Sequence, residues 1–143
     1  MSGDIRFESI GQEGSFLGHV GGIESAVVGD SVEIRLTLDD RHLNPNGTTH
    51  GGLLLTLLDF TLGVTVEHYL GDDLVGHPIT IQLSSSMIGA ASKGETVTGS
   101  AIVTASTKTM TFVSGQITCD DRVLATATAV FRNPRPSASA HIT

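Results

Sequence analysis

The stretch RHLNPNGTTHGGLLLTLLDFTLGVTVEHYL, residues 41–70, decides how the rest of this chain must fold. Between Gly51 and Val66 the one charged residue is Asp59, and apolar residues fall on every side of a helical projection. This pattern predicts a long helix that is buried nearly all round, because a surface helix would keep a polar face. A lone carboxylate in such a helix costs free energy unless it is paired or used.

The predicted helix begins at two adjacent glycines. A turn cluster, Asn44-Pro-Asn-Gly47, leads to His50, Gly51 and Gly52. Glycines are poor helix formers, but they leave the backbone N–H groups of the first turn unshielded. Such amides attract negative charge, including the oxygen of a carbonyl under attack. The stretch therefore combines an electrophile-stabilising end with a carboxylate nine residues after His50.

The same stretch resembles the central motif of the hotdog-fold acyl-CoA thioesterases of the phenylacetate-degradation (PaaI-like) type. The resemblance extends over roughly residues 18–132 and implies an α+β hotdog fold, in which an antiparallel β-sheet wraps around one long central helix. It also implies acyl-CoA thioesterase activity, with sites formed between the subunits of a homodimer or of a homotetramer, a dimer of hotdog dimers. The motif is carried by Asn44, Gly47, His50, Gly51, Gly52 and Asp59.

Length and composition are those of one soluble domain. The chain has 143 residues, which we expect to form a single domain with a lead-in to about residue 17 and a frayed tail from about residue 133. The formal net charge of −7 argues against nucleic acid or an anionic membrane as partner. The first residues lack a basic start with an apolar core, and no apolar run reaches membrane-spanning length, so we predict a cytoplasmic protein. The single cysteine, Cys119, excludes an internal disulfide.

The segments around the helix have the alternation of β-strands. Residues 31–38 place Val32, Ile34 and Leu36 on one face and polar residues on the other. Hairpin-length turns join the later segments, which predicts an antiparallel sheet that must cover the apolar helix. Small residues recur in the last strand, where they would let the helix approach closely. Strands are predicted over residues 19–28, 31–38, 95–104, 109–119 and 122–131, and from residue 79 onward.

Asp59 is the best candidate for a catalytic residue, as a general base or as a nucleophile. The competing interpretation is a structural carboxylate that bonds a backbone group or faces a wet subunit interface. The backbone amides of Gly51 and Gly52 are assigned to polarising the thioester carbonyl; the simpler alternative is a turn that only glycine fits. Gly51 and Asp59 are eight residues apart, or roughly 12 Å along a helix axis. One carbonyl cannot reach both, so either one end alone works or two subunits share a site.

Other residues of the motif have weaker assignments. His50 would orient the thioester or hold the loop. The resemblance places Asn44 near the thioester, although an Asn in this cluster is equally typical of a turn, and Gly47 is most simply a turn residue. Thr80 matches a position where relatives carry a hydroxyl that helps to place the attacking water. An ordinary surface Thr of a strand would look the same.

Substrate phosphates need cations, and Lys93 and Lys108 lie in predicted turns where CoA phosphates could bind. The six histidines are scattered without ligand spacing, so we expect no metal. No organic cofactor is expected either, because CoA would be part of the substrate.

Three other functions remain open. Hydration or dehydration of acyl thioesters also occurs on hotdog folds, but it typically uses a catalytic His paired with a carboxylate. A regulatory or acyl-CoA-binding module without turnover would keep the pocket. The intact Asp59 argues against such a loss of catalysis. Finally, the thioester could be carried on a protein rather than on CoA.

Overall fold

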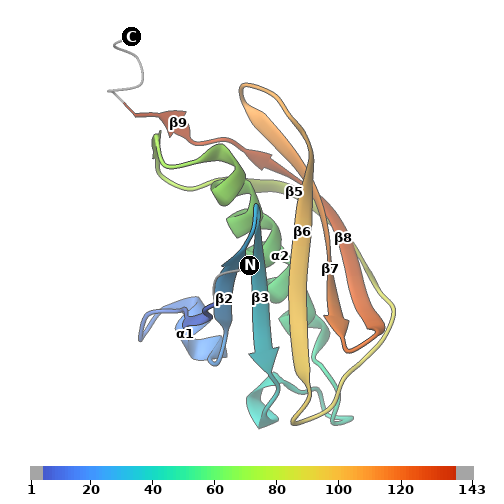
Figure 1. Ribbon diagram of the computed structural model, residues 1–143. Coiled ribbons are helices and arrows are strands. Elements are labelled where there is room, and N and C mark those ends of the chain that lie inside the picture. The colour runs from blue at the N-terminus through green and yellow to red at the C-terminus, as the bar shows by residue number, and fades with distance from the viewer. Residues whose placement is uncertain (1–4, 138–143) are drawn as a thin grey trace.

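The computed structural model of the protein describes residues 5–137, which form one curved sheet around a long helix (Figure 1). The long helix is α2 (Gly51–Leu70), and it lies on the inner side of the sheet. The other elements are β1 (Glu8–Ser9), α1 (Phe16–Val20), β2 (Glu24–Val28), β3 (Ser31–Thr37), the 3-10 turn η1 (Asp40–His42), β4 (Leu74–Val75), β5 (Ile79–Met87), β6 (Thr96–Ser106), β7 (Met110–Cys119), β8 (Arg122–Arg132) and β9 (Arg135–Pro136).

The sheet is antiparallel throughout, as predicted, with the strand order β1-β2-β3-β6-β7-β8-β5. Strand β5 follows α2 in the chain, yet it pairs with β8 and so forms one edge of the sheet. The predicted strand over residues 19–28 is shorter in the structure. Its first part is the end of α1, which Ser15 caps and Gly21 terminates at a φ of 72°, and the strand β2 begins at Glu24.

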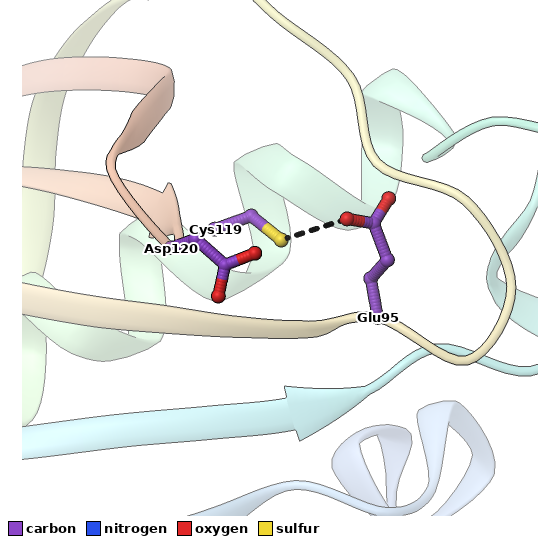
Figure 2. A group of neighbouring side chains, drawn as sticks. All are labelled: Glu95, Cys119 and Asp120. Atoms are coloured by element: carbon purple, nitrogen blue, oxygen red, sulfur yellow. Dashed lines mark hydrogen bonds between the residues drawn. The ribbon is translucent and has the colours of Figure 1, made fainter.

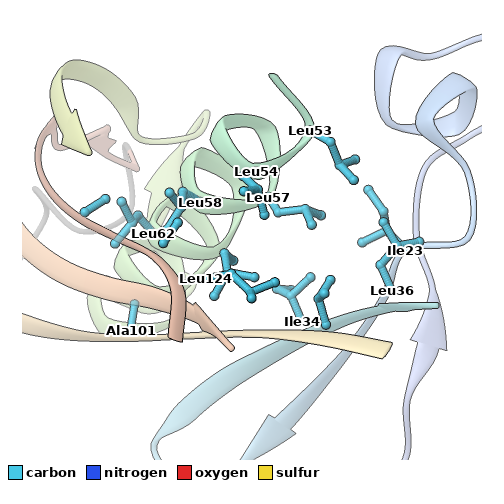
Figure 3. Close-up of a cluster of buried hydrophobic side chains, with 14 of the residues drawn as sticks. Ile23, Ile34, Leu36, Leu53, Leu54, Leu57, Leu58, Leu62, Ala101 and Leu124 are labelled. Carbon is cyan, nitrogen blue, oxygen red and sulfur yellow. The ribbon is translucent and has the colours of Figure 1, made fainter. Parts of the chain in front are cut away.

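The core lies between α2 and the sheet (Figure 3). The alternation predicted for β3 is confirmed, because Val32, Ile34 and Leu36 are all buried. Two core hydroxyls of α2 are satisfied within the helix: Thr61 Oγ1 donates to Leu57 O at 2.6 Å, and Thr65 Oγ1 donates to Thr61 O at 2.8 Å. The buried stripe of α2 consists of Leu53, Leu54, Leu57, Leu58, Thr61, Leu62, Thr65 and Val66.

Small residues of the sheet allow α2 to lie close to it. A Cβ added at Gly99 of β6 would overlap Thr61 Oγ1, and one at Gly115 of β7 would come within 2.9 Å of Leu62 Cδ2. The alanines at alternate positions of β8 face the helix and are buried, as the sequence predicted. Any larger side chain at these positions would push the helix off the sheet.

The prediction that α2 is buried nearly all round is wrong for the single chain. Leu55 is 40% exposed, Asp59 is exposed, and Phe60 and Val64 are half-buried. The physical reason is that the sheet covers one side of the helix only, whereas the apolar residues surround it. Asp59 lies on the side that the sheet leaves open.

The ends of the described chain add two short features. Arg135–Pro136, within the predicted frayed tail, pairs with Leu74–Val75 as a two-stranded sheet near the end of α2. Residues 1–4 of the predicted lead-in and residues 138–143 of the predicted tail lie outside the described residues. By length and composition alone, α2 is apolar enough to cross a membrane, which the sequence prediction had not anticipated. In this structure it is the core helix that packs on the sheet.

Candidate active site

Asp59 and Thr80 are brought together by the packing of β5 beside α2. Thr80 Oγ1 donates a hydrogen bond to Asp59 Oδ1 at 2.6 Å. The strand register explains why Thr80 reaches the helix: it lies opposite Phe131, whose side chain is buried in the core. A hydroxyl donor on one oxygen orients the carboxylate and leaves its other oxygen open. The carboxylate is therefore positioned and accessible, as a base or nucleophile requires.

His50 caps the other end of this site. Its Nδ1 accepts a hydrogen bond from Gly52 N–H at 2.9 Å, so the neutral ring carries its proton on Nε2. Its backbone carbonyl accepts from Leu54 N–H at 3.1 Å. Within residues 5–137, the Gly51 N–H has no acceptor. Of the two glycine amides assigned to the carbonyl, the structure thus engages Gly52 in the cap and leaves Gly51 available at the positive end of α2.

Asn44 organises the loop before the helix. Its Oδ1 accepts from Asn46 N at 2.9 Å and from Thr48 N at 3.1 Å, while its Nδ2 donates to Thr48 Oγ1 at 3.0 Å. Gly47 has a φ of 80° and donates its N–H to Asn44 O, as its predicted turn role requires. In this structure the Asn44 side chain shapes the loop, and a direct contact with substrate stays a prediction.

Strand β5 links the two ends of the site. A Cβ added at Gly51 would lie 3.3 Å from Met87 Sδ, so the last residue of β5 lies beside the helix start. Thr80, near the first residue of β5, lies beside Asp59. Between them on the same face, Ser85 Oγ is buried without a hydrogen-bond partner in the described part of the chain. Gly51 and Asp59 remain two helical turns apart, as the sequence predicted.

His42 is a buried residue of the motif that the sequence interpretation did not single out. Its side chain is 2% exposed and bonds to three backbone groups. Its position two residues before Asn44 was the available signal, but a histidine in a polar loop gives no indication of burial. Its backbone carbonyl accepts from His50 N–H at 3.0 Å, which connects it to the helix start.

The two lysines predicted to bind phosphates have different surroundings. Lys93 Nζ lies 3.0 Å from Asp40 Oδ1 in an exposed ion pair, which lowers its value as a phosphate ligand. Lys108 lies in the β6–β7 turn, where its carbonyl accepts from Asn133 Nδ2 at 3.2 Å. Its ammonium group has no ion-pair partner within residues 5–137.

One cluster of potential metal ligands forms through the fold rather than through sequence spacing. Glu95, Cys119 and Asp120 approach one another where β6 begins and β7 ends (Figure 2). Glu95 Oε2 accepts from Arg122 Nη2 at 2.6 Å and from Cys119 Sγ at 3.4 Å. Its other oxygen accepts from Ser92 N at 2.8 Å.

These contacts govern the ionisation of the cluster. The hydrogen bond from the Ser92 backbone, followed by those from Cys119 and Arg122, holds the pKa of Glu95 below its ordinary value. Burial raises the pKa of the Cys119 thiol, and the adjacent Glu95 carboxylate raises it further. A protonated thiol and an arginine-paired carboxylate are poor metal ligands, so the cluster is best described as a clamp between strands.

One hollow of the surface lies away from these residues. It has a volume of about 620 Å³ and lies on the outer face of the sheet, opposite α2. Serines and threonines line it, among them Ser84, Ser114 and Thr128. None of the predicted site residues borders it. Within residues 5–137, Asp59 is exposed and Gly51 is half-buried, and neither lines this hollow.

Comparisons with known proteins agree with this fold and motif. A family model described as the thioesterase superfamily matches residues 46–126. A Pseudomonas aeruginosa protein with the provisional name of an esterase is 31% identical over 101 residues, which cover 71% of this chain and 74% of that protein. These matches include the motif from His50 to Asp59.

Solved structures are also similar. That of a Ralstonia eutropha JMP134 protein, provisionally named a thioesterase related to phenylacetic acid degradation, is 27% identical, with a TM-score of 0.72 over 82% of this chain and 89% of that one. A hypothetical thioesterase protein of Streptococcus pneumoniae TIGR4, solved with coenzyme A, is 22% identical, with a TM-score of 0.70 over 92% and 99% of the two chains. The hotdog fold predicted from the sequence is thereby confirmed.

Proposed function

Because the chain belongs to the thioesterase superfamily, we propose that it hydrolyses acyl-CoA thioesters to a free acid and CoA. The observation that carries the proposal is the hydrogen-bonded Thr80–Asp59 pair on the open side of a helix whose first amide, that of Gly51, has no acceptor among residues 5–137. CoA as the carrier is supported by the similar Streptococcus pneumoniae protein, whose structure holds coenzyme A. The reaction needs only water, so we propose no metal or organic cofactor.

In the proposed mechanism, the thioester oxygen accepts a hydrogen bond from Gly51 N–H, which stabilises the negative charge that develops on it. Asp59 either removes a proton from the attacking water or attacks the carbonyl carbon itself. The CoA sulfur then leaves as the thiolate and takes up a proton. On the base route this step releases the free acid; on the nucleophile route water hydrolyses the acyl–Asp59 anhydride to the free acid and restores the carboxylate. Thr80 fixes the Asp59 carboxylate, and His50 holds the helix start through Gly52 while its Nε2–H can donate to the substrate.

We propose further that the working site is shared by two copies of the chain. Gly51 and Asp59 of one helix cannot both contact one carbonyl, because roughly 12 Å separate them along the axis. Within residues 5–137 the outer edge of β5 pairs with no other strand, and pairing of two such edges would bring the two groups together. The sequence of β5, ITIQLSSSM, has no charged residue, whereas exposed strand edges are usually protected by Lys, Pro or a covering loop.

The register of β5 predicts what such pairing would bring together. Two β5 strands paired antiparallel about residue 83, the middle of the strand, would bring the Thr80 end of one strand towards the Met87 end of the other. Thr80 contacts Asp59 and Met87 lies beside Gly51. The pairing would therefore bring Asp59 close to Gly51 of the partner subunit, twice in each dimer. It would also cover the open apolar side of α2.

Thiol release from a panel of aryl, short-chain and long-chain acyl-CoAs tests the activity. We expect Asp59→Asn to lower hydrolysis by about 10²–10⁴-fold with folding and assembly unchanged. Asp121→Asn removes an exposed carboxylate from the β7–β8 turn and serves as the matched control, with wild-type turnover expected. Binding of acyl-CoA without turnover by the wild type would instead identify a binding module.

Mixed dimers test the shared site directly. A chain with Asp59→Asn retains Gly51, and a chain with Gly51→Pro, which removes the donor amide, retains Asp59. A dimer of the two would hold one intact site and one doubly defective site. Random pairing of the two inactive variants should then restore about one quarter of wild-type activity. Restoration would be absent if each site used one chain only.

A further inference from the structure

His42 lies at the centre of the connections that hold the start of α2. It ends the turn η1, between β3 and the motif loop, and its imidazole is buried at 2% exposure. The proposed mechanism gives this ring no chemical task, because it has no access to substrate. A buried imidazole with all its hydrogen-bonding capacity used nevertheless fixes its surroundings strongly.

Three hydrogen bonds define the ring. Asp39 N–H donates to Nδ1 at 3.0 Å, so the proton of the neutral ring is on Nε2. Nε2 lies 2.8 Å from Val20 O and 3.1 Å from Gly21 O, and it donates to these carbonyls. The ring thereby joins the turn before α2 to the end of α1, more than twenty residues earlier in the chain.

The backbone of the same residue holds the helix cap. His42 O accepts from His50 N–H at 3.0 Å. His50 in turn accepts from Gly52 N–H with its ring and from Leu54 N–H with its carbonyl. The two hydrogen bonds that His50 accepts from the first turn of α2 thus lead back, through the His50 N–H, to His42, while Thr49 is held separately by its N–H, which donates to Ala91 O at 2.9 Å. The adjacent contact between Leu43 and Thr49 closes the loop on itself but does not reach α1.

We propose that His42 is a positioning residue for the proposed thioesterase reaction: by anchoring its own carbonyl to the end of α1, it fixes where the free amide of Gly51 points. The expected effect on kcat rests on the proposed function, whereas the role of His42 in holding the start of α2 does not. Displacement of a donor amide by even 1 Å can cost about 100-fold in rate. Substrate affinity depends on many other contacts, so the effect falls on kcat rather than on KM.

The test compares His42→Ala with His42→Gln. Gln carries a donor nitrogen at nearly the position of Nε2, so it can keep the bonds to Val20 and Gly21, whereas Ala loses them. We expect Ala to lower kcat by at least about 10-fold with KM changed by less than about 3-fold, and Gln to recover most of the loss. Val113→Ala, a cavity in β7 remote from the loop, controls for lost stability and should leave kcat unchanged.

Amide hydrogen exchange followed by NMR provides a measurement that needs no turnover. In His42→Ala the protection of the Gly52 and Leu54 amides should fall, and in Val113→Ala it should not. If His42→Ala does not fold, His42→Asn, which lacks the distal donor, replaces it in both measurements. A wild-type kcat with unchanged exchange in the variant without the donor overturns the inference. A wild type without thioesterase activity overturns the proposed function, and the exchange result then decides the structural role alone.

Discussion

Thr80 Oγ1 lies 2.6 Å from Asp59 Oδ1, and this hydrogen bond ties the edge strand β5 to the open side of α2. The bond joins residues 21 positions apart, so it depends on the tertiary fold. A hydroxyl that donates to a carboxylate stabilises one orientation of the carboxylate and lowers its conformational entropy. Such an arrangement is useful only where that orientation is needed.

Removing this hydroxyl should impair hydrolysis more than stability. Thr80→Val keeps the shape of the side chain, and Thr80→Ser keeps the donor. Since a hydrogen bond to a charged group contributes about 1.5–3 kcal/mol, Val should lower kcat by about 10- to 100-fold, and Ser should stay within a few-fold of wild type. Steady-state kinetics of both variants check this. Equal losses in Val and Ser would show that the hydroxyl is not what matters.

A charge on the free edge of β5 should prevent assembly. Ile81, in β5, is 46% exposed, and Ile81→Lys would place a lysine charge from each chain at the paired edge. Sedimentation should then give a monomer, and turnover should fall with it. Ile102→Lys, at a 65% exposed position of β6, adds the same charge elsewhere on the sheet and should stay dimeric and active. An active Ile81→Lys monomer would contradict the shared site.

Two glycine substitutions should act in opposite directions on stability. A Cβ at Gly99 would overlap Thr61, so Gly99→Ala should destabilise the fold by about 1–3 kcal/mol. A Cβ at Gly63 of α2 would meet Phe131 at 3.4 Å, an ordinary contact, and Gly63→Ala should stabilise it by about 0.4–1 kcal/mol. Urea unfolding measures both. A neutral Gly99→Ala would mean that the helix can move away from the sheet at little cost.

The Glu95 clamp should make stability depend on pH. The pKa of Glu95 is lowered in the folded state, so its contribution is fully present above its ordinary value of 4.5 and is lost as the pH falls through the folded value. Glu95→Gln should therefore be less stable than wild type at pH 7, with a difference that narrows below pH 4.5. Unfolding curves at pH 7 and at pH 3.5 or lower give the comparison. If the stability difference between wild type and Glu95→Gln did not change with pH, the contribution of Glu95 would come from packing rather than from its charge.

The sequence predicted the fold well because its strongest patterns are local. The alternation in β3 and the apolar run of α2 depend on neighbours two to four residues away, and both elements are where the patterns place them. The extent of burial around α2 was overestimated, because composition cannot tell whether a second layer, or a second molecule, covers the far side of a helix.

The residues of the candidate site were proposed from the sequence, but the hydrogen bonds between them were not. Asp59 and Thr80 were named separately, and only the pairing of β5 with β8 brings them into contact. The capture of the Gly52 amide by His50, and the burial of His42, depend on loop geometry that no periodicity encodes. Contacts made through tertiary structure are the part of the site that a single sequence does not reveal.

If the uncharged edge of β5 pairs with its own copy, as proposed, that edge is no longer available once two molecules have met, so assembly stops at the dimer rather than continuing into a fibre. For a dimeric enzyme with active sites shared between its chains, dilution would lower the measured specific activity just as an inhibitor would. Specific activity would fall as the protein is diluted below its dissociation constant and return on concentration, so a progress curve recorded at very low enzyme would report association before it reports chemistry.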